Sequence, residues 1–276
     1  MPYFRHSVSF RSIFQMDGFN FKDRYNVDDL RLVVKVLRSE NGCPWDKVQT
    51  HETLKKDFLE EVYEVIEAID ANSVPMLREE LGDVLLQVVF HADIEEDAGT
   101  FNLDDVADEV CKKLIERHPH VFGELSLETP EEVLKSWDSI KKEKKQQSFT
   151  DTLNAVPKVF PALMRAQKLG KRASRAGMDF TDANGAFESL RSEVSEAEAA
   201  VISGDTQAIA EELGDILFSC VNVARLSGLD AEELLTASSN KFINRFSAVE
   251  DMVRQDGKEM TSLSIDELDS YWKRAK

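Results

Sequence analysis

The same eight-residue pattern occurs twice in this chain of 276 residues. Residues 79–86 read EELGDVLL and residues 211–218 read EELGDILF, which places the second copy 132 positions after the first. Similarity at one fixed offset indicates two copies of one structural unit. The length agrees with this interpretation, because 276 residues exceed the usual size of a single domain. We therefore predict two related modules.

Four acidic residues recur in both copies at the same spacing. Each copy reads Glu-x-x-Glu and then Glu-x-x-Asp, with 16 positions between the second and third acids. Residues i and i+3 share one face of a helix, and two helices joined by a short turn are antiparallel neighbours. Four carboxylates are therefore expected to converge in each module. They are Glu61, Glu64, Glu80 and Asp83 in the first copy, and Glu193, Glu196, Glu212 and Asp215 in the second.

Carboxylates held this close together repel one another unless a cation neutralises them. A ligand set made only of oxygen atoms selects Mg²⁺, Mn²⁺ or Ca²⁺ over zinc or copper. We expect Mg²⁺, with Mn²⁺ as a possible substitute. The alternative is that these acids cap helices or pair with lysine and arginine.

The hydrophobic pattern predicts an all-α fold. Glycine and proline are scarce, at 12 and 7 residues, and long stretches repeat with helical periodicity while none alternates as a strand does. The run VLLQVVF is apolar nearly all round, so its helix is expected at the centre of a bundle. The expected helices of the first copy cover residues 28–40, 51–70, 76–97, 104–117 and 131–145.

The expected organisation is two tandem modules of the four-helix-bundle type. Residues 28–147 form the first and residues 148–276 the second, with the charged stretch KKEKKQQ (141–147) marking the boundary. Residues 1–27 are expected to be a disordered extension. Residues 1–16 contain arginines and serines but no acid, so a transit peptide is the alternative interpretation.

Charge and cysteine content exclude several classes of function. A net charge of −18 disfavours non-specific nucleic-acid binding, which depends on clustered lysine and arginine. The three cysteines are far apart and show no CxxC spacing, so neither a disulfide framework nor a zinc site is expected, and a reducing cytoplasm fits best. No apolar run approaches the roughly 20 residues that span a membrane.

Basic residues also recur in both copies. Each carries Lys-x-x-x-Arg, as Lys113 and Arg117 in the first copy and as Lys241 and Arg245 in the second. A separate basic segment places four cations on one helix face. That face is either simply exposed to solvent or a positively charged surface that binds phosphates. Its residues are Arg165, Lys168, Arg172 and Arg175.

These motifs together resemble the MazG family of all-α nucleoside triphosphate pyrophosphohydrolases, in order and spacing, from about residue 28 onward. The stretches that carry the resemblance are NGCPWD (41–46), EEVYEVIEAI (60–69), EELGDVLLQVVFHA (79–92), RHPHVFG (117–123), PALMRAQKL (161–169), EELGDILF (211–218) and KFINRF (241–246). The resemblance implies hydrolysis of a nucleoside triphosphate to the monophosphate and pyrophosphate. It also implies a homodimer that completes the helical bundle and the pocket.

The family's metal ligands fall on the eight acids named above. Its phosphate-binding residues fall on Lys241 and Arg245, and its base-contacting aromatic residue falls on Trp272. We expect Lys168, Arg172, Lys113 and Arg117 to contribute to substrate binding as well. The catalytic set is expected in the second copy, as Glu193, Glu196, Glu212, Asp215, Lys241 and Arg245.

The chain departs from the family pattern at two places that concern base selectivity. Ser239 stands where many relatives have asparagine, and Phe180 stands where a tryptophan is frequent. We expect broad specificity and a housecleaning role in the nucleotide pool. The alternative function is a non-catalytic, metal-binding helical module that regulates a partner protein. A di-iron bundle is disfavoured, because neither acid cluster contains the Glu-x-x-His pair of such sites.

Overall fold

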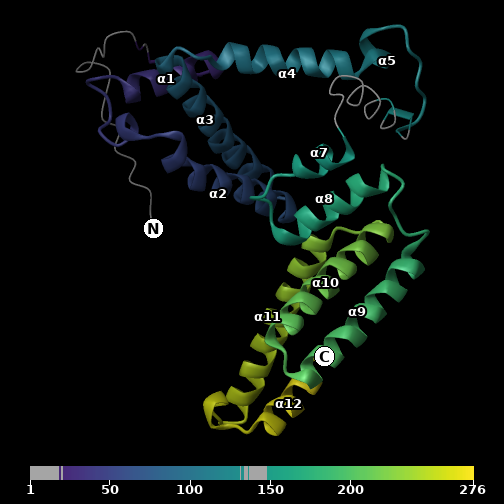
Figure 1. Cartoon of the computed structure of the whole chain (residues 1–276). Coiled ribbons are helices and arrows are strands. Elements are labelled where there is room, and N and C mark those ends of the chain that lie inside the picture. Colours follow the sequence, from purple (N-terminus) through teal and green to yellow (C-terminus); the bar gives the residue numbers. More distant parts are fainter. Residues whose placement is uncertain (1–18, 20, 131, 134–135, 137–147) are drawn as a thin grey trace. The chain divides into compact units, whose positions relative to one another are not determined.

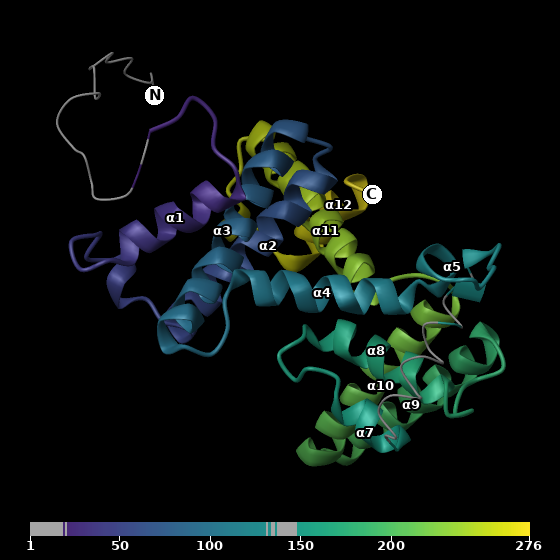
Figure 2. The same ribbon diagram turned by 90° about the horizontal axis from the view of Figure 1, so that it is seen from above.

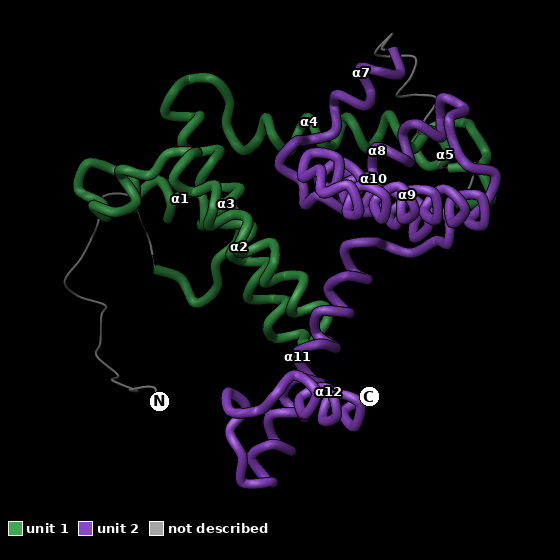
Figure 3. Tube along the Cα trace, turned by 60° about the horizontal axis from the view of Figure 1, so that its bottom comes forward, with its two compact units in different colours: residues 1–140 green, residues 141–276 purple. Residues whose placement is uncertain are grey.

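The computed structural model describes residues 19, 21–130, 132–133, 136 and 148–276. The chain divides into two compact units, residues 1–140 and residues 141–276 (Figure 3). Every regular element among the described residues is a helix, which confirms the all-α prediction. Most of the predicted helix over 131–145, the stretch 141–147 and most of the predicted extension 1–27 lie outside the described residues.

Unit 1 is organised around an antiparallel hairpin of α2 and α3 (Figure 1). Thr50 caps the start of α2 by accepting a hydrogen bond from the backbone N–H of Thr53. Gly99 ends α3 in the left-handed conformation that glycine adopts without strain, with φ of 72°. The elements are α1 (Val27–Arg38), η2 (Asp46–Val48), α2 (His51–Asp70), α3 (Val74–Ala98), α4 (Leu103–Arg117) and α5 (Pro119–Phe122).

The core of unit 1 lies where α1, α2 and α3 meet. It consists of Val34, Leu54, Val89 and Phe90, with Leu103 at the start of α4 packed against it. Helix α3 contacts α1, α2 and α4, so it is central, as the apolar run predicts. It is not covered on every side, however, because Leu85 within this run is 37% exposed.

Unit 2 repeats the hairpin with α9 and α10, which pack against each other. Helix α8 lies against the carboxy-terminal half of α10, where Leu163 and Ala166 contact Val221 and Ala224. Helix α12 packs against the end of α11 (Figure 2). The elements are α7 (Phe149–Asn154), α8 (Ala162–Ser174), α9 (Ala183–Ser203), α10 (Thr206–Leu226), α11 (Ala231–Gln255), η3 (Met260–Ser262) and α12 (Ile265–Arg274).

The two units differ in the helix that follows the hairpin. In unit 2, α11 runs without a break for 25 residues. In unit 1, α4 stops at Arg117 and a four-residue helix begins at Pro119. Proline has no backbone N–H and its ring clashes with the preceding turn, so it interrupts a helix.

In the described part of the chain, no helix combines the length and the apolar character needed to cross a bilayer.

Candidate active site

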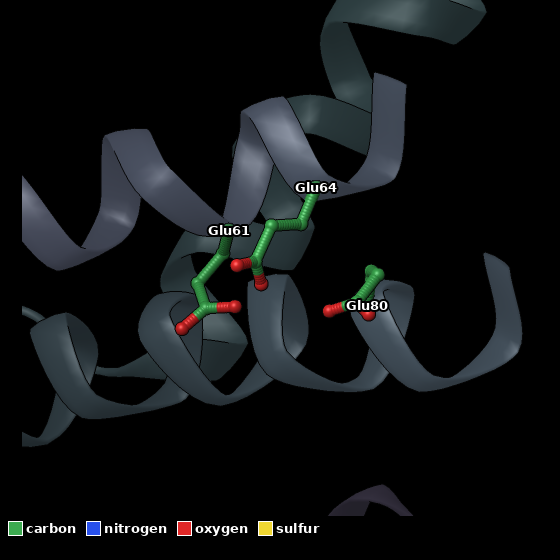
Figure 4. Close-up of side chains that lie close together, drawn as sticks. All are labelled: Glu61, Glu64 and Glu80. Atoms are coloured by element: carbon green, nitrogen blue, oxygen red, sulfur yellow. The ribbon is translucent and has the colours of Figure 1, made fainter. Parts of the chain in front are cut away.

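Three glutamates converge in the unit 1 hairpin (Figure 4). Glu61 and Glu64 project from one face of α2, and Glu80 projects toward them from α3. One carboxylate oxygen of each lies within 4.8 Å of the others, and all three side chains are half-buried. The i, i+3 spacing and the antiparallel pairing of the helices produce this convergence, as the sequence predicts.

The unit 1 cluster lacks compensating positive charge. Burial raises the pKa of Glu61, and the charges of Asp83, Glu64 and Glu80 raise it further. Burial and the charge of Glu64 likewise raise the pKa of Glu80. Among the described residues, no lysine or arginine forms an ion pair with these three glutamates. The pairing alternative therefore does not hold for them.

Unit 2 assembles the equivalent cluster from α9 and α10. Oxygen atoms of Glu193, Glu196 and Glu212 lie within 4.8 Å of one another. Glu196 is exposed and accepts a hydrogen bond of 3.0 Å from the hydroxyl of Ser192. Burial raises the pKa of Glu212, followed by the charges of Glu196, Asp215 and Glu193. Three of the four predicted acids therefore converge in each unit.

The fourth predicted acid of each module stands beside its cluster. Asp83 and Asp215 are not among the side chains whose oxygens converge within 4.8 Å. Their charges nevertheless raise the pKa values of Glu61 and Glu212. Aspartate is one methylene shorter than glutamate, which keeps its carboxylate nearer to its own helix.

Lys241 and Arg245 lie one turn apart on α11, beside an aromatic cluster. The ring of Phe242 is 5.2 Å from that of Trp272 on α12 and 6.2 Å from that of Phe246. Lys241 is exposed and Arg245 is half-buried. In the described part of the chain, neither cation forms an ion pair with the acid cluster of unit 2. The structure thus brings Trp272 to Phe242, the residue after Lys241, but it does not bring the two cations to the glutamates within one chain.

The remaining predicted cations lie away from the glutamates of their own unit. On α8, Arg172 donates to the backbone carbonyl of Thr152, and the Lys168 ammonium is 6.0 Å from the ring centre of Phe160. Gly170 of α8 approaches Asn222, ten residues or about 15 Å along α10 from Glu212. These side chains therefore hold α8 in place and do not face the cluster.

Lys113 and Arg117 of unit 1 are separated from its core in the same way. Leu103 packs against the core, and Lys113 follows it by ten residues, or about 15 Å along α4. Lys113 is exposed and Arg117 is half-buried. Their role in substrate binding stays a prediction.

Comparison with known proteins agrees with this geometry. The sequence profile of the family described as "MazG nucleotide pyrophosphohydrolase domain" matches residues 49–122 and 184–249. Each match spans one hairpin with its acid cluster and the helix that follows. The chain belongs to the MazG family. This confirms the predicted family, its two-module architecture and its enzyme class.

Three relatives are similar over most of the chain. A Thermotoga maritima protein named "Nucleoside triphosphate pyrophosphohydrolase/pyrophosphatase MazG" is 41% identical over 249 residues, which cover 90% of this chain and 95% of the relative. The Escherichia coli K12 "Nucleoside triphosphate pyrophosphohydrolase" is 41% identical over 254 residues, covering 91% and 97%. The "Uncharacterized protein YabN" of Bacillus subtilis is 42% identical over 247 residues, covering 89% of this chain and 50% of that protein.

Proposed function

We propose that this protein hydrolyses nucleoside triphosphates to a nucleoside monophosphate and pyrophosphate, with Mg²⁺ held by its glutamate clusters. The observation that carries the proposal is the convergence of three uncompensated carboxylates in each hairpin of a MazG-family chain. Mn²⁺ has the same preference for oxygen ligands and is the expected substitute. A broad housecleaning role in the cytoplasm fits an enzyme of this class.

The donor atoms present fit a hard divalent cation. All of them are carboxylate oxygens, and burial followed by neighbouring carboxylates raises the pKa of Glu61, Glu80 and Glu212. Glu61, Glu64 and Glu80 would hold the ion in unit 1, and Glu193, Glu196 and Glu212 in unit 2. A bound Mg²⁺ neutralises phosphate oxygens and lowers the pKa of a coordinated water.

Other side chains are proposed to bind the phosphates and the base and to accept a proton. Lys241 supplies a compact positive charge to the phosphates, and Arg245 supplies a planar fork of donors. The cluster of Phe242, Phe246 and Trp272 offers aromatic faces to the base. We propose Glu211, which directly precedes Glu212 on α10, as the base that accepts a proton from the attacking water.

The products of hydrolysis test this proposal directly. Purified protein incubated with Mg²⁺ and each canonical nucleoside triphosphate is expected to release monophosphate and pyrophosphate, resolved by anion-exchange chromatography. Release of diphosphate and orthophosphate would instead indicate a phosphatase. Absence of any turnover would favour the non-catalytic regulatory module.

The same assay in EDTA is the control for the metal. Activity is expected to vanish in the chelator and to return with Mg²⁺ or Mn²⁺ but not with Zn²⁺ alone, because the ligand set contains only oxygen. Full activity in EDTA would contradict a role for the glutamate clusters in metal binding.

We further propose that the protein is a homodimer in which hairpins of two copies complete each four-helix bundle. Large apolar side chains are exposed on the hairpin of unit 2, among them Leu217 at 57% and Ile202 at 87%. The hairpin of unit 1 shows the same feature, with Ile66 at 46% and Leu81 at 51%. Exposed apolar side chains on the hairpins offer contacts that a second copy would cover. In such a dimer, the cations on α11 of one copy would lie near the glutamates of the other copy. Within a single chain, α11 does not reach those glutamates.

Replacing Leu217 by aspartate is expected to weaken this dimer. A buried charge without a partner is strongly unfavourable at an apolar interface. Light scattering coupled to size-exclusion chromatography should then show monomers at concentrations where the wild-type protein is dimeric. Ile265→Asp on α12, which replaces a residue that is 78% exposed, is the matched control and should leave the mass unchanged. An unchanged mass for Leu217→Asp would place the dimer contact elsewhere.

A further inference from the structure

A chain of hydrogen bonds links the start of α2 to the end of α3 in unit 1. His51 is the first residue of α2, and its Nδ1 lies 2.7 Å from Nδ1 of His91. Its other ring nitrogen, Nε2, lies 2.6 Å from Oε1 of Glu95, one turn after His91. The two imidazole rings stack with their centres 5.0 Å apart. Glu95 also accepts a hydrogen bond from the hydroxyl of Thr100.

This arrangement limits the number of protons that the two histidines can hold. Nε2–H of His51 donates to the carboxylate of Glu95, and the contact between the two Nδ1 atoms needs a single proton, donated by one ring and accepted by the other. If both rings were protonated, two N–H groups would face each other at 2.7 Å. The closed arrangement therefore takes up at least one proton fewer than two separated imidazoles.

The groups around His51 and His91 do not change this limit on the number of protons. Burial lowers the pKa of His91, and the charge of His51 lowers it further. The ring of Phe58, also on α2, is 5.7 Å from that of His91 and offers no charge. The cations of α1 are engaged with other acids of α3 and α4. These ion pairs are Arg31 with Asp104, Lys35 with Glu96, and Arg38 with Asp93 and Asp97. On α2 itself, Lys55 pairs with Glu52.

The position of the histidine pair in the hairpin gives it a structural role. The turn between α2 and α3 closes one end of the hairpin, and the glutamate cluster lies between that turn and the histidines. The hydrogen bonds of His51 therefore join the two helices at the open end. His51 is 46% exposed as a side chain, so solvent protons reach it directly.

Unit 2 has no equivalent of this contact. With the offset of 132 residues, the positions of His51, His91 and Glu95 correspond to Ala183, Val223 and Ser227. None of these side chains titrates. The two hairpins therefore share their glutamates but differ in this feature.

We propose that Glu95, His51 and His91 form a one-proton clasp that holds the open end of the unit 1 hairpin at neutral pH and releases it in acid. The device makes the first unit acid-sensitive and leaves the second unit without such a response. It acts through the packing of α2 against α3 and does not depend on the reaction that the protein catalyses.

The sign of the pH effect follows from proton linkage. A separated imidazole has a pKa of about 6.5, so the opened state binds more protons than the closed state below that pH. The closed state is therefore fully stable above about pH 6.5 and loses stability as the pH falls. At pH 5.5 the protonated form of a separated imidazole exceeds the neutral form by about tenfold. Because the closed state cannot bind this second proton, the equilibrium between closed and opened states shifts toward opening by about tenfold.

Hydrogen exchange of the full chain measures this opening. We expect protection of the backbone amides in residues 51–57 and 91–98 to fall about tenfold between pH 7.5 and pH 5.5, after correction for intrinsic rates. Residues 183–189 and 223–229 of unit 2 provide the internal reference and should show no such fall. Equal protection of the unit 1 segments at both pH values would overturn the proposal.

Variants that carry the unit 2 residues separate the clasp from other causes. His91→Val, and the triple variant His51→Ala, His91→Val and Glu95→Ser, should both show protection that is independent of pH in this range. His120→Gln on α5 is the control and should retain the tenfold fall. A His91→Val protein that loses protection as the wild type does, or a His120→Gln protein that does not, would assign the acid response to other groups.

Discussion

Replacing Glu212 by glutamine is expected to lower the steady-state rate of triphosphate hydrolysis by about 100-fold, equivalent to ~2.7 kcal/mol of transition-state stabilisation. The substitution keeps the size of the side chain but removes one charge from the cluster of Glu193, Glu196 and Glu212. Glu80→Gln makes the same change in unit 1 and is the matched control. We expect it to keep the rate within about twofold of the wild type.

The asymmetry follows from what surrounds the two clusters, because both sets of glutamates are complete. In unit 2, the hairpin is followed by an unbroken helix that carries Lys241, Arg245 and Phe242, and the ring of Phe242 lies 5.2 Å from that of Trp272. In unit 1, the corresponding helix ends at Arg117, and Pro119 redirects the chain. We therefore propose that the second module carries most of the turnover.

Loss of activity in Glu212→Gln should not result from unfolding. Burial and neighbouring carboxylates raise the pKa of Glu212, so the fold disfavours the charge of this side chain, and glutamine carries no such charge. An acid whose pKa is raised by folding does not destabilise the folded protein at low pH. The destabilisation develops as the pH rises through the pKa of the acid in the folded state. In EDTA at pH 7.5 the variant should therefore melt no lower than the wild type, as followed by circular dichroism. A rate lost in Glu80→Gln and retained in Glu212→Gln would assign the activity to the first module.

Local features of the fold could be predicted from the sequence because they depend on nearby residues. The capping threonine at position 50 and the apolar periodicity define α2 as His51–Asp70, as predicted. The convergence of the glutamates also follows from i, i+3 spacing on two antiparallel helices. Three acids meet within 4.8 Å in each unit where four were expected, and Asp83 and Asp215 are the acids left out.

Features that depend on the packing of distant segments could not be predicted in this way. Helical spacing places Lys168 and Arg172 on one face of α8 but does not say which part of α10 that helix meets. The contacts of Leu163 and Ala166 with Val221 and Ala224 fix α8 at the carboxy-terminal half, away from Glu212. Similarly, the apolar run 84–90 predicts a helix covered on all sides, yet Leu85 is exposed in a single chain. Its pattern matches the environment that we propose for the dimer.

The second large effect is expected for Arg245→Ala, which should lower kcat/KM by about 10- to 100-fold. A hydrogen bond from a charged donor contributes about 1.5–3 kcal/mol, and each 1.36 kcal/mol changes a rate about tenfold. Arg254→Ala is the matched control, because Arg254 lies further along the same helix and only pairs with Glu250 and Asp251. It should leave kcat/KM within about twofold of the wild type.

Arg245→Lys separates the charge of this side chain from its geometry. Lysine keeps the positive charge but lacks the planar fork that binds two phosphate oxygens at once. If Arg245 binds the triphosphate as proposed, kcat/KM of the lysine variant should lie between the values of the wild type and of Arg245→Ala. Steady-state kinetics on one triphosphate across the three variants gives the order. A lysine variant as slow as the alanine variant would show that the fork contributes the whole effect, whereas equal rates for Arg245→Ala and Arg254→Ala would remove Arg245 from the substrate site.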